Sequence, residues 1–365
     1  MVTAVPLSIS NSSDRIPRNG AIVSLLVGLT LSIFVFGIIE LRLRQIGIKP
    51  NVHDAKELWA YERGRASALG DKSLIIVGDS RAQVDLDLPT LANSTGLEPI
   101  QLAIDGSQFM AVLDDLANDP KITGTILVGA ETWKLLPHRG KDRSNEFVSF
   151  YNNEYRGKWG PMVEAKIKGL VQSWSVFYSS GIPLSLLFPM LINKDLGLKP
   201  SYLTMHSSRQ RDADYNLVKQ PNFYIARVLR HLGNSHTIDF SNIRSETEFI
   251  HEVLNKLAEE PRAAGIDAAM FEHVNKLINR ILDRQAKIIF VRFPSSALIW
   301  EIDKYRSPRA SYWDHFAAST RARTFHFSDF KDLQFQLPDG SHLDVRDKVA
   351  FTKALAKILR DSNAI

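Results

Sequence analysis

The chain has 365 residues, of which 44% are hydrophobic and 23% charged, a composition typical of a folded globular protein rather than a disordered one. Cysteine is absent, which excludes disulfides, thiolate nucleophiles and cysteine-ligated metal or iron–sulfur centres. The formal net charge of +5 is mildly basic. Because the sequence carries no lysine- or arginine-rich arm, P-loop, zinc finger or RNA-binding motif, we expect no nucleic-acid partner.

The first predicted element is a membrane-spanning helix. Residues 19–39 carry no charged side chain, and their apolar centre, Ala21–Ile39, would cover about 30 Å as a helix, the thickness of a bilayer core. A buried core helix fits poorly, because the stretch is long and has no polar face. A cleaved signal peptide is the other alternative, disfavoured because no small-residue cleavage site precedes Arg42. We therefore expect a tail at 1–18 and an uncleaved anchor at 19–39.

Beyond the anchor, short apolar strands alternate with helices. A juxtamembrane connector, 40–71, contains a predicted helix at Lys56–Ala68. Further helices are predicted at Phe109–Asn118 and Phe271–Gln285. Buried strands are predicted at Ser73–Val77, Pro99–Ile104, Thr125–Val128 and Lys287–Val291. This alternation predicts an α/β domain over 72–361, with a parallel sheet covered by helices on both faces in three layers.

A helical insertion is predicted at about 137–265, where this alternation stops. Its uncharged segment, Val171–Asn193, allows a second membrane span, an interfacial segment or the packed helices of a cap. Packed helices are favoured, because Pro183 and Pro189 would break a spanning helix. The basic residues of the insertion are expected to form a solvated face, with a polyanion groove as the alternative; they are Arg209, Arg211, Lys219, Arg227 and Arg230.

Two distant segments carry the residues for nucleophilic chemistry. The first predicted strand runs into Gly78-Asp79-Ser80, which places a serine at the carboxyl end of a strand, where open α/β sheets keep their sites. Near the C-terminus, Asp339 and His342 are three residues apart in a turn rich in proline and glycine. That spacing lets a carboxylate hold one imidazole nitrogen while the other faces a nucleophile. A helix cap and an ordinary turn are the simpler interpretations of the two segments taken singly.

Together, these two segments resemble the SGNH (GDSL) hydrolase superfamily, whose sheet is flavodoxin-like, over roughly 73–135 and 285–360. The resemblance implies that Ser80 is the nucleophile, His342 the general base and acid, and Asp339 the residue that orients His342. The motif Asp-Gly-Ser-His-Leu, followed by Phe351-Thr352, is similar to the sequences of the membrane-anchored branch of this superfamily. That branch includes alginate O-acetyltransferase-like envelope proteins.

The resemblance also assigns the oxyanion hole, with one departure. Ser80 supplies one backbone donor, and Gly106 matches the glycine of the second family block. Glu131 stands where the family has an asparagine donor, and a carboxylate would repel the developing oxyanion unless it is protonated. Either another residue substitutes for that donor, or activity is low, or the domain binds without catalysing.

Three further residues are candidates for substrate binding. Asp79 and Arg81 flank the nucleophile, and Arg292 follows the fourth predicted strand. The two arginines suit an anionic group, although a structural ion pair fits each equally well. No histidine spacing matches a metal site, so we expect neither a metal nor a cofactor.

The expected protein is therefore a single-pass membrane serine esterase or O-acyltransferase acting on an acylated envelope carbohydrate polymer. Charges flanking the anchor do not fix its orientation, and the resemblance places the large domain on the extracytoplasmic, periplasmic side. Two alternatives remain: a non-catalytic carbohydrate-binding or assembly partner of an integral-membrane acyltransferase, which Glu131 favours, and a membrane-tethered lipase-like esterase, which Val171–Asn193 favours.

Overall fold

The computed structural model describes residues 18–131, 142–182, 185, 189, 198–233, 238, 240, 243–260 and 267–365. The tail predicted at 1–18 therefore lies, except for its last residue, outside the described part of the chain. Much of Val171–Asn193 beyond Ile182, including Pro183, lies outside it as well.

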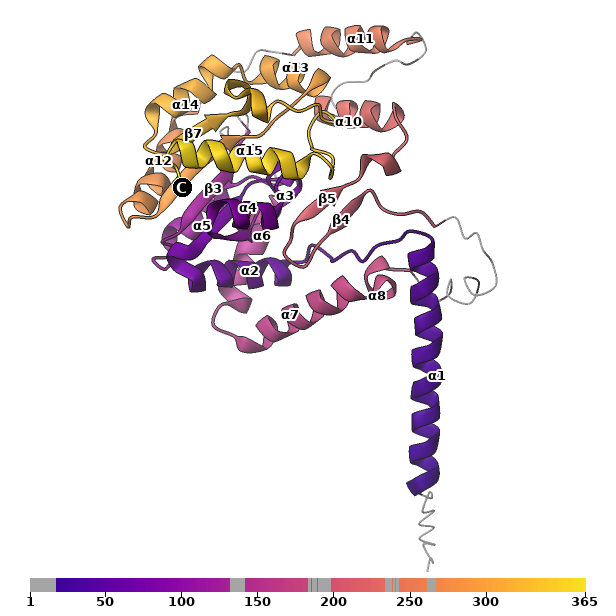
Figure 1. Cartoon of the computed structure of the whole chain (residues 1–365). Helices are drawn as coiled ribbons and strands as arrows, with labels where there is room; N and C mark the ends of the chain where they lie inside the picture. The colour runs from indigo at the N-terminus through magenta and orange to yellow at the C-terminus, as the bar shows by residue number, and fades with distance from the viewer. Residues whose placement is uncertain are drawn as a thin grey trace, which may run out of the picture.

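A five-stranded parallel sheet forms the centre of the protein (Figure 1). Its strands lie in the order β2-β1-β3-β6-β7, so β1 lies between β2 and β3. The chain passes from β1 to the edge strand β2 and then returns to β3 on the other side of β1. Open α/β sheets leave a crevice at this reversal, outside the carboxyl ends of the strands. The strand bounds are β1 Ser73–Val77, β2 Glu98–Gln101, β3 Thr125–Gly129, β6 Lys287–Arg292 and β7 Arg323–His326.

Helices cover both faces of this sheet, which confirms the predicted α/β class. Alternate side chains of each strand point to opposite faces, so Ile75 and Val77 join one core while Leu74 and Ile76 join the other. The first core packs against α2 (Lys56–Leu69), α5 (Met110–Asn118), α12 (Ala268–Leu282) and α14 (Trp313–Ser319). The second packs against α4 (Leu88–Thr95) and α15 (Lys348–Asp361).

The region predicted as a helical insertion also contains a β-hairpin. Strands β4 (Leu203–Met205) and β5 (Arg211–Ala213) pair antiparallel, so the insertion predicted as helical contains a short sheet besides its helices. Each strand has only three residues, too few for a period-two pattern to stand out. The helical elements here are α6 Arg143–Phe150, the π-helical turn η3 Tyr151–Tyr155, α7 Trp159–Trp174, α8 Val176–Ser180, α10 Asn222–Leu232 and α11 Glu246–Ala258. After it come α12, β6 and then α13 (Ala297–Arg306), which leads from the sheet toward β7.

The N-terminal helix α1, Arg18–Gln45, extends away from the domain (Figure 1). Its stretch Gly20–Gln45 is long and apolar enough to cross a membrane, a composition that a signal sequence would share. The helix runs beyond the predicted boundary at residue 39, because its last turns pack on the domain. Ile39 and Leu43 are buried against Val176, and the Glu40 carboxylate accepts hydrogen bonds from Val176 N at 2.9 Å and Phe177 N at 3.0 Å.

Candidate active site

The end of β1 can reach the site only because residue 78 is glycine. Gly78 has φ +147°, and a Cβ there would lie 2.9 Å from Gly129 O and 3.0 Å from the Ala82 side chain. The ends of β1 and β3 therefore approach more closely than any other residue would permit. The next residues form α3, Ser80–Val84, immediately outside the strand.

Asp79, and not Ser80, caps this short helix. The Asp79 Oδ1 accepts a hydrogen bond from Arg81 N at 2.9 Å, which satisfies a backbone donor at the start of α3. Ser80 is the first helical residue and is half-buried. Its hydroxyl is therefore not used in capping.

A tight turn after Pro338 positions the aspartate and the histidine. The Asp339 Oδ1 accepts hydrogen bonds from Ser341 N and His342 N, both at 2.8 Å. Gly340 has φ +77°, and a Cβ at this position would lie 2.5 Å from Ile299 Cγ1, so the turn requires glycine here too. The backbone of the turn is thereby fixed by the same carboxylate that orients the imidazole.

Ser80, His342 and Asp339 form a continuous series of hydrogen bonds. His342 Nδ1 lies 2.8 Å from Asp339 Oδ2, and His342 Nε2 lies 2.8 Å from Ser80 Oγ. An ionised carboxylate only accepts, so the proton belongs on Nδ1 and Nε2 is left to accept from the serine hydroxyl. This arrangement can remove the hydroxyl proton as the oxygen attacks an electrophile.

The surroundings of Asp339 keep its carboxylate ionised. Burial raises its pKa, but the attraction and hydrogen bond of His342 and the nearby Arg227 guanidinium outweigh burial and hold the pKa well below its usual range. Arg227 Nε lies 3.5 Å from Asp339 Oδ2. The Tyr215 hydroxyl, also close by, remains neutral because burial and the Asp339 carboxylate both raise its pKa.

A second buried carboxyl, Asp85, supports the same turn from α3's end. Its Oδ1 accepts a hydrogen bond from Leu343 N at 2.9 Å. Burial raises the pKa of Asp85 to about 7, and Asp339 adds to that rise, while His342, the Leu343 amide and Arg81 act in the opposite direction. Nothing in the sequence pattern identified this residue.

A cavity of about 290 Å³ opens beside Ser80. Gly106 lines it, as the resemblance implied for an oxyanion-hole glycine, and has φ +70°. The lining comes from the segments that follow β1, β2 and β3 and from α10, so the cavity lies at the carboxyl end of the sheet. The other lining residues are Asp79, Arg81, Asp105, Ser107, Gln108, Glu131, Arg227, Arg230 and His231.

Glu131 occupies the cavity as one partner of a buried ion pair with Arg81. Arg81 Nη2 also lies 3.6 Å from Asp303 Oδ2. Burial lowers the pKa of Arg81, but Glu131 and Asp303 outweigh this and raise it, so the guanidinium is charged. The carboxylate that replaces the expected asparagine therefore faces the cavity with its charge largely balanced.

Two arginines predicted at the site or surface have structural roles instead. Arg292 does not line the cavity: its Nη2 is fully buried against Asp303 Oδ2 at 2.6 Å, which corresponds to the structural ion pair left open above. Arg209, expected on a solvated face, is fully buried as well. It donates to Gln101 O at 2.7 Å and to Asp54 Oδ1 at 2.7 Å. In both cases a carboxylate, that of Asp303 or Asp54, balances the charge of the guanidinium, and no linear pattern shows this pairing.

Helix α10 supplies cavity residues, two of which, Arg227 and Arg230, were expected on a solvated face or in a polyanion groove. Arg227, Arg230 and His231 all line the cavity, and His231 Nε2 lies 2.8 Å from Asp303 Oδ1. Their spacing of three and four places them on one face of a helix, which was the available signal. Among the residues described, no group of three or more histidine, aspartate or glutamate side chains is placed to hold a metal ion.

No protein-family model matches this chain, and no curated protein matches it in sequence.

Proposed function

We propose that this protein is a membrane-anchored serine esterase or O-acyltransferase of the SGNH hydrolase class. It acts on ester groups of an envelope carbohydrate through an acyl-Ser80 intermediate, with α1 as its membrane anchor and the large domain on the extracytoplasmic side. The observation that carries the proposal is the hydrogen-bonded series Ser80–His342–Asp339 beside an open cavity. Ser80 and His342, which are hydrogen-bonded to each other, are 262 residues apart in the sequence.

Acylation begins when Ser80 Oγ attacks the ester carbonyl carbon as His342 Nε2 takes the hydroxyl proton. Asp339 holds Nδ1–H and stabilises the resulting imidazolium. Collapse of the tetrahedral intermediate breaks the bond to the alkoxide, which leaves with the proton from His342. Water or a sugar hydroxyl then gives its proton to His342 and attacks the acyl-Ser80 carbonyl, which releases the acyl group as an acid or a new ester and restores Ser80.

Stabilisation of the oxyanion rests on Ser80 N and on Gly106, which lines the same cavity. Glu131 offers no donor, but its partner Arg81 offsets the repulsion that a lone carboxylate would exert. Arg230 adds a further cation to the lining. We therefore expect a lower kcat than a site with three oxyanion donors would give, since the loss of one donor lowers kcat by about 100- to 1000-fold in other hydrolases.

The lining supports a polar substrate. Charged groups surround Ser80, including Asp105, Glu131 and Arg230, so a long alkyl chain would have to lie against ions. Carbohydrate hydroxyls, by contrast, can hydrogen-bond to these groups. This favours the carbohydrate esterase or acyltransferase over the lipase-like alternative.

Glu131 itself favours a second candidate function, a non-catalytic carbohydrate-binding partner of a membrane-bound acyltransferase. A carboxylate in place of an oxyanion donor suits binding of a hydroxyl-rich ligand better than stabilisation of an anion. The two candidates differ in whether Ser80 reacts.

A fluorophosphonate probe tests the proposal directly, because it reacts with serine hydroxyls activated by a neighbouring base. We expect labelling of the full chain in detergent, its loss in Ser80→Ala and its retention in Ser311→Ala, which changes an exposed serine outside the cavity. p-Nitrophenyl acetate should be hydrolysed faster than long-chain esters. A folded wild-type chain that is never labelled would support the binding partner, and equal labelling of Ser80→Ala would remove Ser80 from the mechanism.

A further inference from the structure

Helix α7 presents its largest apolar side chains outward. Trp159 and Trp174 are each 78% exposed, and Val163, Ile167 and Leu170 lie exposed between them. Steps of four, four, three and four residues place all five on one face of the helix. The opposite face is buried against the domain through small residues, where Gly169 approaches Leu58.

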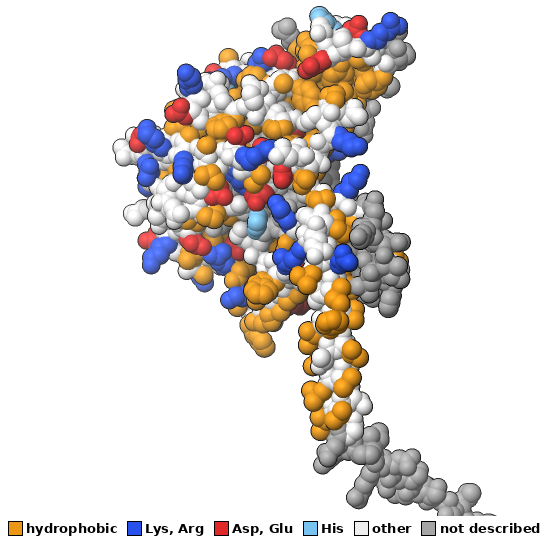
Figure 2. All heavy atoms as spheres, turned by 45° about the vertical axis from the view of Figure 1, so that its right-hand side comes forward, with side chains coloured by type: hydrophobic (Ala, Val, Ile, Leu, Met, Phe, Trp, Pro, Cys, Tyr) orange, Lys and Arg blue, Asp and Glu red, His pale blue; other side chains and the backbone are white. Residues whose placement is uncertain are grey.

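This apolar face is continuous with the apolar surface of α1. A hollow between the two helices is lined by Phe36 and Gly37 on one side and by Leu170, Val171 and Trp174 on the other. Figure 1 shows α7 on the side of the domain from which α1 extends, and Figure 2 shows hydrophobic side chains along α1 and on the adjoining face of the domain. The Phe36 ring also contacts Phe177 of α8 at 5.4 Å between centroids.

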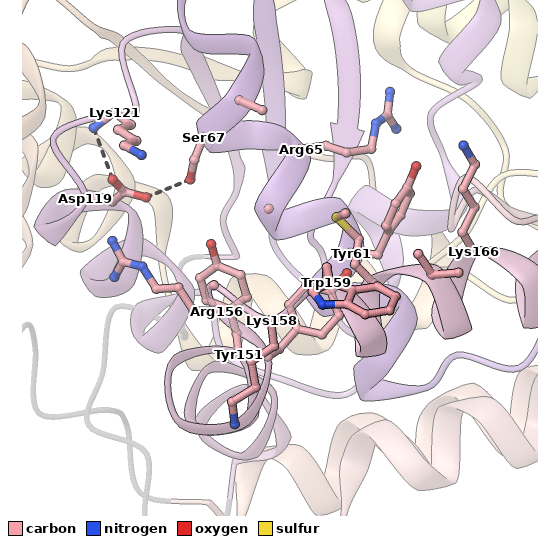
Figure 3. A pocket seen from close by; sticks show the side chains of 16 residues that line it. Tyr61, Arg65, Ser67, Asp119, Lys121, Tyr151, Arg156, Lys158, Trp159 and Lys166 are labelled. Atoms are coloured by element: carbon pink, nitrogen blue, oxygen red, sulfur yellow. Dashed lines mark hydrogen bonds between the residues drawn. The ribbon is translucent and has the colours of Figure 1, made fainter.

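A cationic and aromatic cavity of about 770 Å³ lies beside this face, between α2 and α7 (Figure 3). Tyr61 and Trp159 contribute aromatic rings to its wall. Asp119, the acidic lining residue, already binds Ser67 and the buried Arg63. The cations of the lining are Arg65, Lys121, Arg156, Lys158 and Lys166, and all of these except Arg65 are exposed.

These features share the chemistry of a bilayer surface. Apolar side chains along one helix face, tryptophans near its ends and flanking lysines are typical of helices that lie in the plane of a membrane interface. Anionic lipid headgroups attract cations that lie within a Debye length of the surface. Because α1 packs against α8, which follows α7 directly, the C-terminal end of the α7 face lies beside residues 36–37 of the anchor, near the point where α1 leaves the bilayer.

We propose that the α7 face, Trp159–Trp174, lies in the headgroup layer of the bilayer that α1 crosses, and that the cavity between α2 and α7 holds the headgroup of an anionic lipid. The inference rests on the membrane anchor of the proposed function and is independent of Ser80 chemistry. Two attachments, one spanning and one interfacial, hold the domain in a single orientation to the membrane. Helix α7 shares only its last four residues with Val171–Asn193, the segment for which an interfacial position was one alternative.

The absence of cysteine allows a clean test in the full chain. Single variants Leu29→Cys in α1, Ile167→Cys in α7 and Glu272→Cys at an exposed position of α12 carry an environment-sensitive fluorophore in nanodiscs with one chain each. We expect the label at 167 to be quenched by shallow lipid-borne quenchers and to be about tenfold less accessible to iodide than the label at 272. The label at 29 should report the bilayer centre.

The lipid requirement is tested with the same labels. Including about 30% phosphatidylglycerol should increase the protection of position 167, and Lys121→Gln/Lys158→Gln/Lys166→Gln should remove that increase. If phosphatidylglycerol increases the protection of position 167 from iodide equally in the triple variant, the proposed headgroup site is overturned. If the label at position 29 lies in the bilayer while the label at position 167 is exposed to water, the inference about α7 is overturned and the anchor stands. If the label at position 29 is also exposed to water, the anchor is overturned as well. Protection of 167 that rises with protein concentration in detergent would assign the face to a second copy instead.

Discussion

At the scale of single residues, the account depends on which atom of His342 carries the proton. The Asp339 carboxylate accepts from Nδ1 and its pKa is held low, so Nε2 faces Ser80 as a base. The same carboxylate also fixes the backbone of its own turn through Ser341 N and His342 N. A change at Asp339 should therefore act on chemistry more than on folding, provided that these backbone acceptors are kept.

Asp339→Asn tests this point. An asparagine oxygen can still accept from the two backbone amides, but its amide group beside His342 Nδ1 favours the tautomer with the proton on Nε2. We expect kcat/KM for p-nitrophenyl acetate to fall by about 10³- to 10⁴-fold, as in other triads, with the melting temperature changed by only a few degrees. A loss smaller than about tenfold would show that Asp339 does not set the tautomer.

Asp85 makes stability depend on pH in a defined direction. Its pKa in the folded protein is raised to about 7 from 3.8, so between these values the unfolded chain releases a proton that the folded chain keeps. Stability from this group is therefore lost as pH rises from about 4 to about 7. Asp85→Asn should remove that loss, so that the variant gains about 1–4 kcal/mol relative to wild type between pH 4.5 and pH 8. Thermal unfolding of both proteins in detergent at the two pH values measures this, and an equal difference at both would contradict it.

At the scale of elements, the site is held where a turn meets the start of a helix. Ser296 N, at the start of α13, donates to Gly340 O at 3.0 Å, and Ile299 of the same helix fills the space beside Gly340. Helix α13 thus supports the Asp339–His342 turn, while α3 presents Ser80 from β1. These two supports set the distance of 2.8 Å between Ser80 Oγ and His342 Nε2.

Gly340→Ala should disturb this support more than an equivalent change elsewhere. The methyl group would need about an ångström more space against Ile299, in addition to the strain of a left-handed alanine, which costs about 1–3 kcal/mol. Gly96→Ala is the matched control, because Gly96 has φ +73° and a Cβ there would meet nothing within 4 Å. We expect Gly340→Ala to lower the melting temperature at least twice as much and to reduce esterase activity. Equal effects of the two changes would show that the contact with Ile299 is unimportant.

At the scale of the whole molecule, every strand of the central sheet could be predicted from the sequence except β7, one of its two edge strands. After their first residues, Ser73 and Thr125, the runs at 73–77 and 125–128 are entirely apolar, and the structure buries β1 and β3 on both faces. The edge strand β7, Arg323–His326, begins with an exposed arginine and buries only its last two residues. A run so short and mixed resembles a loop until a neighbouring strand pairs with it.

The same contrast applies to the site. Ser80, Asp339 and His342 belong to short sequence motifs that can be recognised along the chain, and the structure brings the three residues together. Arg230 and His231 reach the cavity only because α10 packs with α11 and α13 in a separate core. Asp303 is buried and pairs with His231, Arg81 and Arg292. No spacing in the sequence indicates that these residues meet. Residues whose role arises from tertiary packing therefore lay beyond sequence reasoning.

The most direct test of the central claim is to trap the covalent intermediate. Full-length protein mixed with p-nitrophenyl acetate and quenched in acid should gain the mass of one acetyl group, located by peptide mass spectrometry on the peptide that contains Ser80. The adduct should be absent from Ser80→Ala, and it should accumulate much more slowly in His342→Ala. A wild-type chain that hydrolyses the ester while its adduct maps to another residue, or that never acquires one, would contradict the account.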